Sequence, residues 1–313
     1  MNVLLTGATG QLGRSLQACR PSHWTLHALS RAQLDITDRA AIAAAMDALR
    51  PTLVINAAAY TAVDQAERDQ DHAYAVNHQG AANVAQAAGA AGARLVHLST
   101  DYVFDGLSAQ PYAEDDPPHP INVYGASKRS GELAVLQDHP GACVVRTSGV
   151  FSEYGRNFLK TMLHLAGRAD AQPLRVVNDQ RCCPTYAGDL AQAIVAMVEA
   201  QAAAGIYHYC GATALSWHAY AQRIFQQAWK QGGLQRQGEG DCAGGAAPWP
   251  VGANRQGLPI VQPIGSSDYP GAAPRPANSV LSCGKLQALG IEPRPLDDAL
   301  ARALRGIILS GFR

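Results

Sequence analysis

Short apolar runs alternate with alanine-rich stretches through the first half of the chain. The runs are rich in Val, Ile and Leu and roughly four to six residues long, which is typical of buried strands. The stretches between them have the length and composition of helices. This alternation predicts βαβ units and an α/β fold with a Rossmann-like, doubly wound parallel sheet covered on both faces. The expected strands are 3–6, 25–29, 53–56, 94–99 and 143–147, and the expected helices are 11–19, 39–49, 72–91 and 124–137.

The pattern is looser after residue 150. The segment 231–278 is rich in Gly, Pro and Ala and has little periodicity, which predicts a long surface loop or lid. We therefore expect two parts, residues 1–150 and residues 151–313, the second a smaller, mostly C-terminal α/β lobe that also returns to the sheet of the first. Its expected helices are 157–166, 186–199, 216–231 and 296–308, and its expected strands are 175–177 and 206–209.

Composition and charge exclude several classes of protein. The 313 residues include 25 acidic residues and 25 Lys plus Arg, so the formal net charge is zero. We expect neither nucleic acid nor a membrane as a partner, because no broad basic surface is available and no apolar stretch reaches the roughly 18 residues of a membrane helix. The first apolar run is too short for a signal segment. The cysteine count of seven is odd, and no C-x-x-C pair occurs, which indicates reduced thiols and a cytoplasmic protein.

A glycine-rich loop follows the first expected strand and leads into the first expected helix. Three glycines three residues apart also occur in plain turns, but this position is the one that a dinucleotide fingerprint requires. Gly7 allows a tight turn, Gly10 lets the backbone approach a pyrophosphate, and Gly13 permits close helix packing. The helix N-terminus offers free N–H groups to the phosphates. We expect residues 1–150 to bind NAD(P) through Gly7, Gly10, Gln11, Leu12 and Gly13, and residues 151–313 to bind the substrate.

The residues after the second expected strand bear on the choice between NAD and NADP. An acid there binds the ribose 2′-hydroxyl of NAD, whereas a nearby Arg accommodates the 2′-phosphate of NADP. This chain has Ser30 and Arg31 at that place. We expect NADPH as the cofactor, with NADH also accepted. An ordinary solvated role for Arg31 stays open.

A tyrosine and a lysine four residues apart supply candidate acid–base chemistry. Tyr124 and Lys128 share one face of an expected helix. A carbonyl reduction needs a proton donor, and a nearby ammonium is expected to lower the pKa of the phenol from its usual value of about 10. Upstream, Ser99 and Thr100 end the fourth expected strand, where hydroxyls can orient a substrate carbonyl.

These residues resemble the extended short-chain dehydrogenases and, among them, the dTDP-4-dehydrorhamnose reductase group. The two most specific blocks are Asn-Ala-Ala-Ala-Tyr-Thr-Ala-Val-Asp at 56–64 and Ser-Thr-Asp-Tyr-Val-Phe-Asp-Gly at 99–106. The blocks follow the family order over nearly the whole chain. The others lie at 7–13, 34–38, 124–128, 178–180, 184–185 and 275–279.

The resemblance implies reduction of the 4-keto group of a nucleotide-activated 6-deoxysugar, best matched by dTDP-4-dehydro-L-rhamnose going to dTDP-L-rhamnose in cell-surface polysaccharide biosynthesis. It implies hydride transfer from NADPH and proton donation by Tyr124. The implied catalytic residues are Thr100, Tyr124 and Lys128, of which Tyr124 and Lys128 also contact the cofactor. Implied further cofactor contacts are Asp35 and Ile36 at the adenine and Ala57, Ala58 and Ala59 at the nicotinamide ribose, and the sugar would face Thr61, Val63, Asp101 and Tyr102.

The chain departs from the family pattern at several positions. Gly149 stands where the family usually has Trp, which removes a flat surface for packing a sugar or base. Cys182 and Cys183 fall in a segment that usually carries a glycine, and we interpret them as small buried apolar residues. Ser15 replaces an acid that binds a bridging magnesium ion in some members. We therefore predict no metal ligand, and leave a homodimer open.

Two alternatives use the same scaffold. An epimerase that keeps NAD bound would favour an acid near Arg31, and a dehydratase would need a Glu at the position of Tyr102. A non-catalytic NADP-binding regulatory subunit is the other alternative. It is favoured by the missing indole at Gly149 and opposed by the intact Thr100, Tyr124 and Lys128.

Overall fold

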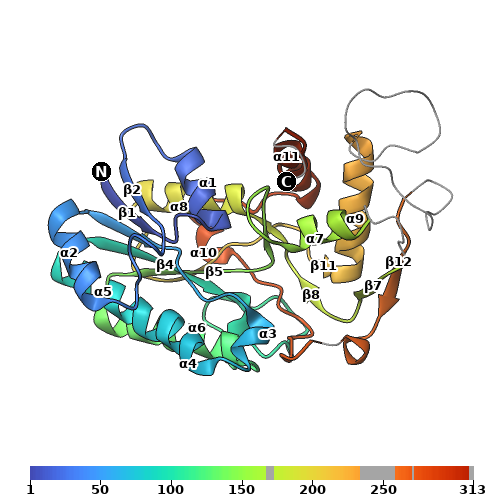
Figure 1. Cartoon of the computed structure of the whole chain (residues 1–313), viewed down its shortest axis with the longest axis horizontal. Helices are drawn as coiled ribbons and strands as arrows, with labels where there is room; N and C mark the ends of the chain where they lie inside the picture. The colour runs from blue at the N-terminus through green and yellow to red at the C-terminus, as the bar shows by residue number, and fades with distance from the viewer. Residues whose placement is uncertain (167–172, 233–257, 270, 310–313) are drawn as a thin grey trace.

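The computed structural model describes residues 1–166, 173–232, 258–269 and 271–309, and its centre is a six-stranded parallel sheet (Figure 1). The strands lie in the order β10-β5-β4-β3-β1-β2. Their order in the sheet therefore reverses between β1 and β3, and ligands of open α/β sheets bind at such a switch point, outside the carboxyl ends of the strands. The bounds are β1 (Asn2–Thr6), β2 (Thr25–Leu29), β3 (Leu53–Asn56), β4 (Arg94–Thr100), β5 (Cys143–Thr147) and β10 (Gly205–His208).

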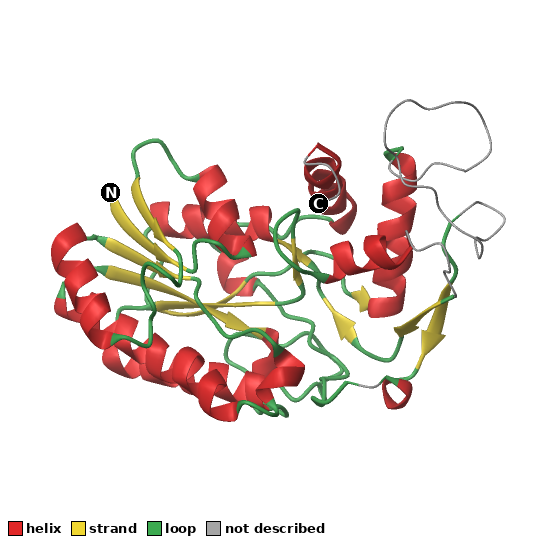
Figure 2. Cartoon of the chain, in the orientation of Figure 1, coloured by secondary structure: helices red, strands yellow, loops and turns green. Residues whose placement is uncertain are grey.

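Helices cover both faces of the sheet (Figure 2). Alternate residues of a strand point to opposite faces. Val3 and Leu5 therefore join an apolar cluster with two helices, α1 and α8, whereas Leu4 joins a cluster with α2, α5 and α6 on the other face. Burial on both faces explains the continuous apolar runs of these strands. The helix bounds are α1 (Gln11–Cys19), α2 (Arg39–Leu49), α5 (Ala81–Ala90), α6 (Val123–Asp138) and α8 (Ala187–Glu199).

The predicted α/β class and doubly wound parallel sheet are confirmed, but the single helix predicted over 72–91 is wrong. That segment is α4 (Gln70–Tyr74), a π-helix η1 (Ala75–Gly80) and then α5. Asn77 lies in the π-helix, and its side-chain amide hydrogen-bonds the backbone N–H and C=O of Tyr60 and the hydroxyl of Ser127. These partners are distant in sequence, so the periodicity of the segment carries no sign of them.

A second apolar core lies beside the sheet in what we call the C-terminal lobe, formed by three helices and a strand pair (Figure 1). The loop predicted over 231–278 is wrong in part, because β12 pairs in parallel with β7 and η3 follows it. Residues 233–257 of that prediction lie outside the described residues. The bounds are α7 (Phe158–Ala166), α9 (Trp217–Lys230), α11 (Leu296–Leu309), β7 (Leu174–Val177), β12 (Val261–Ile264) and η3 (Ser266–Asp268).

Short elements connect the sheet and the C-terminal lobe. β6 pairs with β9 in parallel, and β8 pairs with β11 in antiparallel orientation. After β9 the chain returns to the six-stranded sheet as α8 and β10. The boundary at residue 150 stays a prediction. The bounds are α3 (Val63–Ala66), η2 (Asp101–Val103), β6 (Val150–Phe151), β8 (Arg181–Cys182), β9 (Thr185–Tyr186), β11 (Leu215–Ser216) and α10 (Gly284–Gln287).

Two glycines let α6 lie directly against neighbouring backbone. A Cβ at Gly125 would overlap the carbonyl oxygen of Tyr102, and a Cβ at Gly131 would overlap the carbonyl oxygen of Asn77. The helix begins after Asn122, whose side-chain oxygen accepts a 2.7 Å hydrogen bond from the N–H of Gly125. The cap and the two close approaches together fix the position of α6 along the sheet.

Replacing Gly131 with Ala should therefore destabilise the protein. We expect a loss of roughly 1–3 kcal/mol in the free energy of unfolding, because the added methyl group meets backbone that cannot move aside. Gly89→Ala is the matched control, since a Cβ there lies 3.4 Å from its nearest neighbour, the Asp138 carbonyl oxygen. The control should be neutral or stabilising by up to about 1 kcal/mol. Urea denaturation of both variants measures the difference, and equal stabilities would contradict the close approach.

Candidate active site

A cavity of about 560 Å³ opens at the carboxyl ends of β1 and β3. Its size is within the usual range of cofactor pockets. The predicted cofactor residues line it with the exception of Ser30, which borders a second hollow of about 600 Å³ on the other side of Thr9. The lining includes Gly7, Gly10, Gln11, Leu12, Gly13, Arg31, Asp35, Ile36, Ala57, Ala58, Ala59, Thr61, Tyr124 and Lys128.

The glycine loop packs as closely as its sequence predicted. Gly7 has a φ of +69°, and a Cβ there would lie 2.7 Å from the backbone of Ala57 and Ala58. A Cβ at Gly13 would lie 2.8 Å from the Cα of Ala8. Gly10 is the N-cap of α1, so the free N–H groups of that helix face the cavity. The N–H groups at this helix end can bind an anion such as a phosphate.

A hydrogen-bonded chain below the loop fixes the segment after β3. The Asn56 side-chain oxygen accepts from the hydroxyl of Thr6 at 2.7 Å and from the N–H of Ala58 at 3.3 Å. Its amide nitrogen lies 3.1 Å from Nδ1 of the buried His97. Asn56 itself is fully buried. Thr6, Asn56 and His97 therefore hold the wall of the cavity that contains Ala57 and Ala58.

The end of the cavity after β2 carries one exposed ion pair. Arg31 Nε lies 3.3 Å from Asp35 Oδ2. Hydrogen bonds from the N–H and hydroxyl of Thr37 lower the pKa of Asp35, and Arg31 adds to this effect. Ser30 is engaged elsewhere, because its N–H and hydroxyl both donate to the side-chain oxygen of Gln33. Of the two residues predicted to choose between NAD and NADP, Arg31 is thus the one that faces the cavity.

Tyr124 and Lys128 lie together at the inner wall of the cavity. Burial raises the pKa of Tyr124 to about 12, a hydrogen bond with Thr100 works against that rise, and the charge of Asp101 adds to it. Burial lowers the pKa of Lys128 to about 8, opposed by the charge of Glu132. The Lys128 ammonium donates to the carbonyl oxygen of Leu98 at 2.6 Å. The prediction that Lys128 lowers the pKa of Tyr124 is therefore wrong for the protein alone, in which Tyr124 is a neutral phenol at pH 7.

Thr100 and Asp101 form a buried hydroxyl–carboxylate pair behind Tyr124. The Thr100 hydroxyl donates to Asp101 at 3.0 Å and accepts from the N–H of Tyr102 at 3.1 Å. Ser148 donates to the other Asp101 oxygen at 2.7 Å. Burial raises the pKa of Asp101, and hydrogen bonds from Ser279, Ser148 and Thr100 partly offset the rise. The carboxylate is thus engaged with protein groups.

The residues predicted to face the sugar are spread around this pair. Thr61 lines the cavity, whereas Val63 begins α3, and Val63, Asp101 and Tyr102 do not line it. The rings of Tyr102 and Tyr124 meet edge to face with centroids 5.9 Å apart. Gly149 has a φ of +53°, and a Cβ there would lie 3.3 Å from Pro184 Cα and 3.8 Å from Cys182 Sγ. Cys182 and Cys183 are buried free thiols, as we interpreted them.

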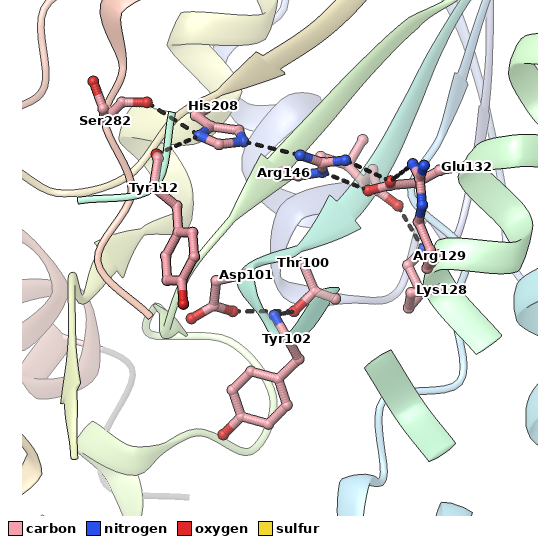
Figure 3. A network of polar contacts seen from close by, with 11 residues as sticks. Thr100, Asp101, Tyr102, Tyr112, Lys128, Arg129, Glu132, Arg146, His208 and Ser282 are labelled. Carbon is pink, nitrogen blue, oxygen red and sulfur yellow. Dashed lines mark hydrogen bonds and ion pairs between the residues drawn. The ribbon is translucent and has the colours of Figure 1, made fainter. Parts of the chain in front are cut away.

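A buried ion pair joins α6 to the sheet (Figure 3). Arg146 donates to both oxygens of Glu132 at 2.8 Å, and both side chains are almost fully buried. Arg129 contacts the same carboxylate at 2.9 Å. Burial works to raise the pKa of Glu132, but the hydrogen bond and charge of Arg146 outweigh it and lower that pKa. On the far side, His208 Nε2 lies 3.4 Å from Arg146 Nη1.

The residues present fit a bound dinucleotide. The helix end, the glycine cradle and the cations Arg31 and Lys128 supply anion contacts along one cavity. In the described part of the chain the buried hydroxyl of Thr147, which lines the cavity, has no hydrogen-bond partner. Such a hydroxyl is expected to meet a polar ligand or water. Over the same residues, no cluster of three or more His, Cys, Asp or Glu side chains has metal-binding geometry.

Comparison with known proteins agrees with this geometry. A sequence model of the RmlD substrate binding domain family matches residues 1–308. The chain belongs to this family. Its relatives include the dTDP-4-dehydrorhamnose reductase of Aggregatibacter actinomycetemcomitans, which is 40% identical over 306 residues, 95% of this chain and 96% of the relative.

Two further RmlD-family comparisons bear on the site. The dTDP-4-keto-6-deoxy-D-glucose reductase of Streptomyces niveus is 42% identical over 225 residues, 71% of this chain and 77% of the relative. The crystal structure of dTDP-4-dehydrorhamnose reductase from Bacillus anthracis in complex with NADP has a TM-score of 0.84 at 35% identity, and the match covers 97% of this chain and 98% of that one.

Among the described helices, none is both long and apolar enough to cross a membrane.

Sequence reasoning missed part of the cavity of this RmlD-family protein. Leu98 and Thr147 lie at or near the carboxyl ends of β4 and β5, so the position of ligands in α/β sheets could have identified them. Gly155 and Arg156 come from the connection between β6 and α7. No motif marks that connection, and only the fold brings it to the cavity.

The buried His208 should make stability depend on pH. Burial and the charge of Arg146 lower its pKa to about 4. Below about pH 6.5 the unfolded chain binds a proton that the native protein does not, so stability falls as the pH drops from about 6.5 to about 4, by about 2 kcal/mol at pH 5. His208→Gln should lose this part of the slope in urea denaturation between pH 7 and pH 5. His164→Gln, an exposed control on α7, should keep the slope; an unchanged slope in His208→Gln would contradict the assignment.

Proposed function

We propose that the protein is an NAD(P)H-dependent oxidoreductase that reduces the 4-keto group of dTDP-4-dehydro-L-rhamnose to give dTDP-L-rhamnose. The observation that carries this proposal is that Tyr124 and Lys128 line the same cavity as the glycine loop, with the buried Thr100 hydrogen-bonded to Tyr124. Family membership supports it, because relatives over nearly the full chain are named as reductases of this substrate.

The cofactor would be held by the glycine loop at its pyrophosphate, by the segment after β3 at its nicotinamide ribose and by Asp35 and Ile36 at its adenine. NADPH is favoured because Arg31 faces the cavity and because the Bacillus anthracis relative was solved with NADP. When bound, the reduced nicotinamide supplies the hydride. Lys128 is placed to bind ribose hydroxyls in exchange for its contact with Leu98.

The proton would come from Tyr124. With a pKa of about 12 the phenol is protonated at neutral pH, which is the state that a proton donor to a developing alkoxide needs. Asp101 would act as a positioning residue, since it accepts a hydrogen bond from the Thr100 hydroxyl and so fixes the position of the Thr100 oxygen beside Tyr124. The Thr100 oxygen also accepts the N–H of Tyr102, which restricts its rotation further.

The sugar would lie near Thr61, Val63 and Tyr102, over the edge of Tyr124. Glycine at 149 replaces the indole of the family pattern at that position, and a side chain there would meet Pro184 and Cys182. The substrate fit would therefore depend on smaller side chains than the family pattern predicts. The similarity to a dTDP-4-keto-6-deoxy-D-glucose reductase favours that sugar as a second candidate.

We further propose that residues 1–150 form the NAD(P)-binding domain and residues 151–313 the substrate-binding part. The protein would work in the cytoplasm. Arg31 disfavours an epimerase. The presence of Tyr124 and Lys128 in one cavity disfavours a regulatory subunit.

The direct test is oxidation of NADPH and NADH by the purified protein, with dTDP-4-dehydro-L-rhamnose generated in situ and a control without the sugar. The proposal expects sugar-dependent turnover and formation of dTDP-L-rhamnose, identified by chromatography. Turnover with dTDP-4-keto-6-deoxy-D-glucose alone would replace the substrate. Cofactor binding without turnover on either sugar would refute the proposal.

Tyr124→Phe should abolish most turnover and leave the cofactor bound. The phenol donates the proton only in the chemical step, so kcat should fall by about two orders of magnitude or more while the Kd for NADPH changes little. Tyr60→Phe, which removes a hydroxyl from the same cavity lining, is the control. Parallel losses of kcat and of NADPH affinity in Tyr124→Phe would refute the proton-donor role.

Arg31→Ala should change the cofactor preference. An arginine at a 2′-phosphate is expected to contribute a charge-assisted contact, so the Kd for NADPH should rise about tenfold and the Kd for NADH should stay the same. Fluorescence titration of both dinucleotides measures the change, with the exposed Arg20→Ala as the control. An equal change for the two dinucleotides would mean that Arg31 does not contact the 2′-phosphate.

A further inference from the structure

A short segment of the chain after β6 lies against the start of α1. Gly155 and Arg156 line the same cavity as Gly10 and Gln11. Gly155 has a φ of +62°, and a Cβ there would lie 3.5 Å from Cγ of Gln11. The segment therefore reaches the helix end that is expected to hold a pyrophosphate.

Gln11 holds this segment in place with its whole side-chain amide. Its oxygen accepts from the Ser152 hydroxyl and from the Asn157 side-chain nitrogen, each at 2.9 Å. Its nitrogen donates to the carbonyl oxygen of Val150 at 3.3 Å. The side-chain nitrogen of Asn157 also donates to the carbonyl oxygens of Ser152 and Tyr154. Residues on both sides of Arg156 are thus tied to the first residue of α1.

Arg156 is exposed and carries a charge that its described neighbours leave unengaged. Over the residues that the structure describes, no hydrogen bond or ion pair is formed by its guanidinium, whereas Arg31 is paired with Asp35 and Lys128 donates to Leu98. The side-chain oxygen of Gln11 is engaged by Ser152 and Asn157, and its nitrogen donates to Val150. The N-terminus of α1 offers backbone N–H groups to two phosphates, and a nearby guanidinium would complete that anion site.

We propose that Arg156 binds the pyrophosphate of the dinucleotide and that Gln11 acts as a positioning residue for it. This deepens the proposed function, because it rests on NAD(P)H being the cofactor. The fingerprint residue Gln11 would then contribute by holding the segment from 150 to 157 over the cofactor, rather than by touching it. Since both NADH and NADPH carry the pyrophosphate, Arg156 would serve the two equally, whereas Arg31 would serve only the 2′-phosphate.

The test is the Kd of NADPH and of NADH, measured by fluorescence titration without substrate on the full chain. We expect Arg156→Ala to weaken both dinucleotides by about tenfold or more, which is the effect of losing a charge-assisted contact. Arg156→Lys should recover most of the affinity. Arg175→Ala, which removes an exposed arginine from β7, is the matched control and should change neither Kd.

Three outcomes would overturn the assignment. A loss for NADPH alone would place Arg156 at the 2′-phosphate. Unchanged Kd values with a raised KM for the nucleotide sugar would place it at the substrate, and unchanged values throughout would leave it without a ligand role. If the unmodified protein bound neither dinucleotide, the proposed function itself would fail, which is a separate result.

A double-mutant cycle tests the positioning role of Gln11. Gln11→Met removes the three hydrogen bonds and keeps the length of the side chain. It should weaken both dinucleotides in the unmodified protein and have little further effect in the Arg156→Ala variant, because its action passes through Arg156. Additive losses would show that Gln11 acts independently and would overturn this part of the proposal.

Discussion

The buried pair of Glu132 and Arg146 is the interaction on which the arrangement of this site depends. A bidentate ion pair without solvent contact tolerates little displacement, since any shift leaves a charge unpaired in the interior. It joins α6 to β5, while the glycines at 125 and 131 bring the same helix against Tyr102 and Asn77. Tyr124 and Lys128 are carried by that helix and Thr100 by the adjacent strand β4. The relative positions of Thr100, Tyr124 and Lys128, which we propose to be catalytic, are therefore decided by contacts outside the cavity.

The cofactor end of the cavity is likewise fixed by contacts between protein groups. Close packing holds the glycine loop, and hydrogen bonds hold Asn56 and Gln11 to other parts of the chain. Backbone N–H groups and a few cations are left for the ligand. Two different parts of the chain then meet at one helix end, because Arg156 arrives from the connection between β6 and α7. Cofactor binding in this account depends on the packing of both parts of the molecule.

Much of this could be predicted from the sequence, for reasons that are local. The strands around the cavity are buried on both faces, so their apolar runs are continuous, and the glycine spacing records a steric requirement of the turn. The failures are non-local. The π-helix at Ala75–Gly80 accompanies the bonds of Asn77 to Tyr60 and Ser127, and β12 forms from a Pro- and Gly-rich segment by pairing with β7. The pKa of Tyr124 is raised chiefly by burial, and Arg156 has no motif at all.

The measurement that tests the central claim most directly is a double-mutant cycle on kcat between Glu132→Gln and Tyr124→Phe, with each rate expressed per folded protein from near-UV circular dichroism. If the ion pair acts by placing α6, Glu132→Gln should lower kcat markedly when Tyr124 is present and have almost no effect when Phe is there. Equal losses in the two backgrounds would contradict the account, because the ion pair would then affect turnover by a route other than the position of Tyr124.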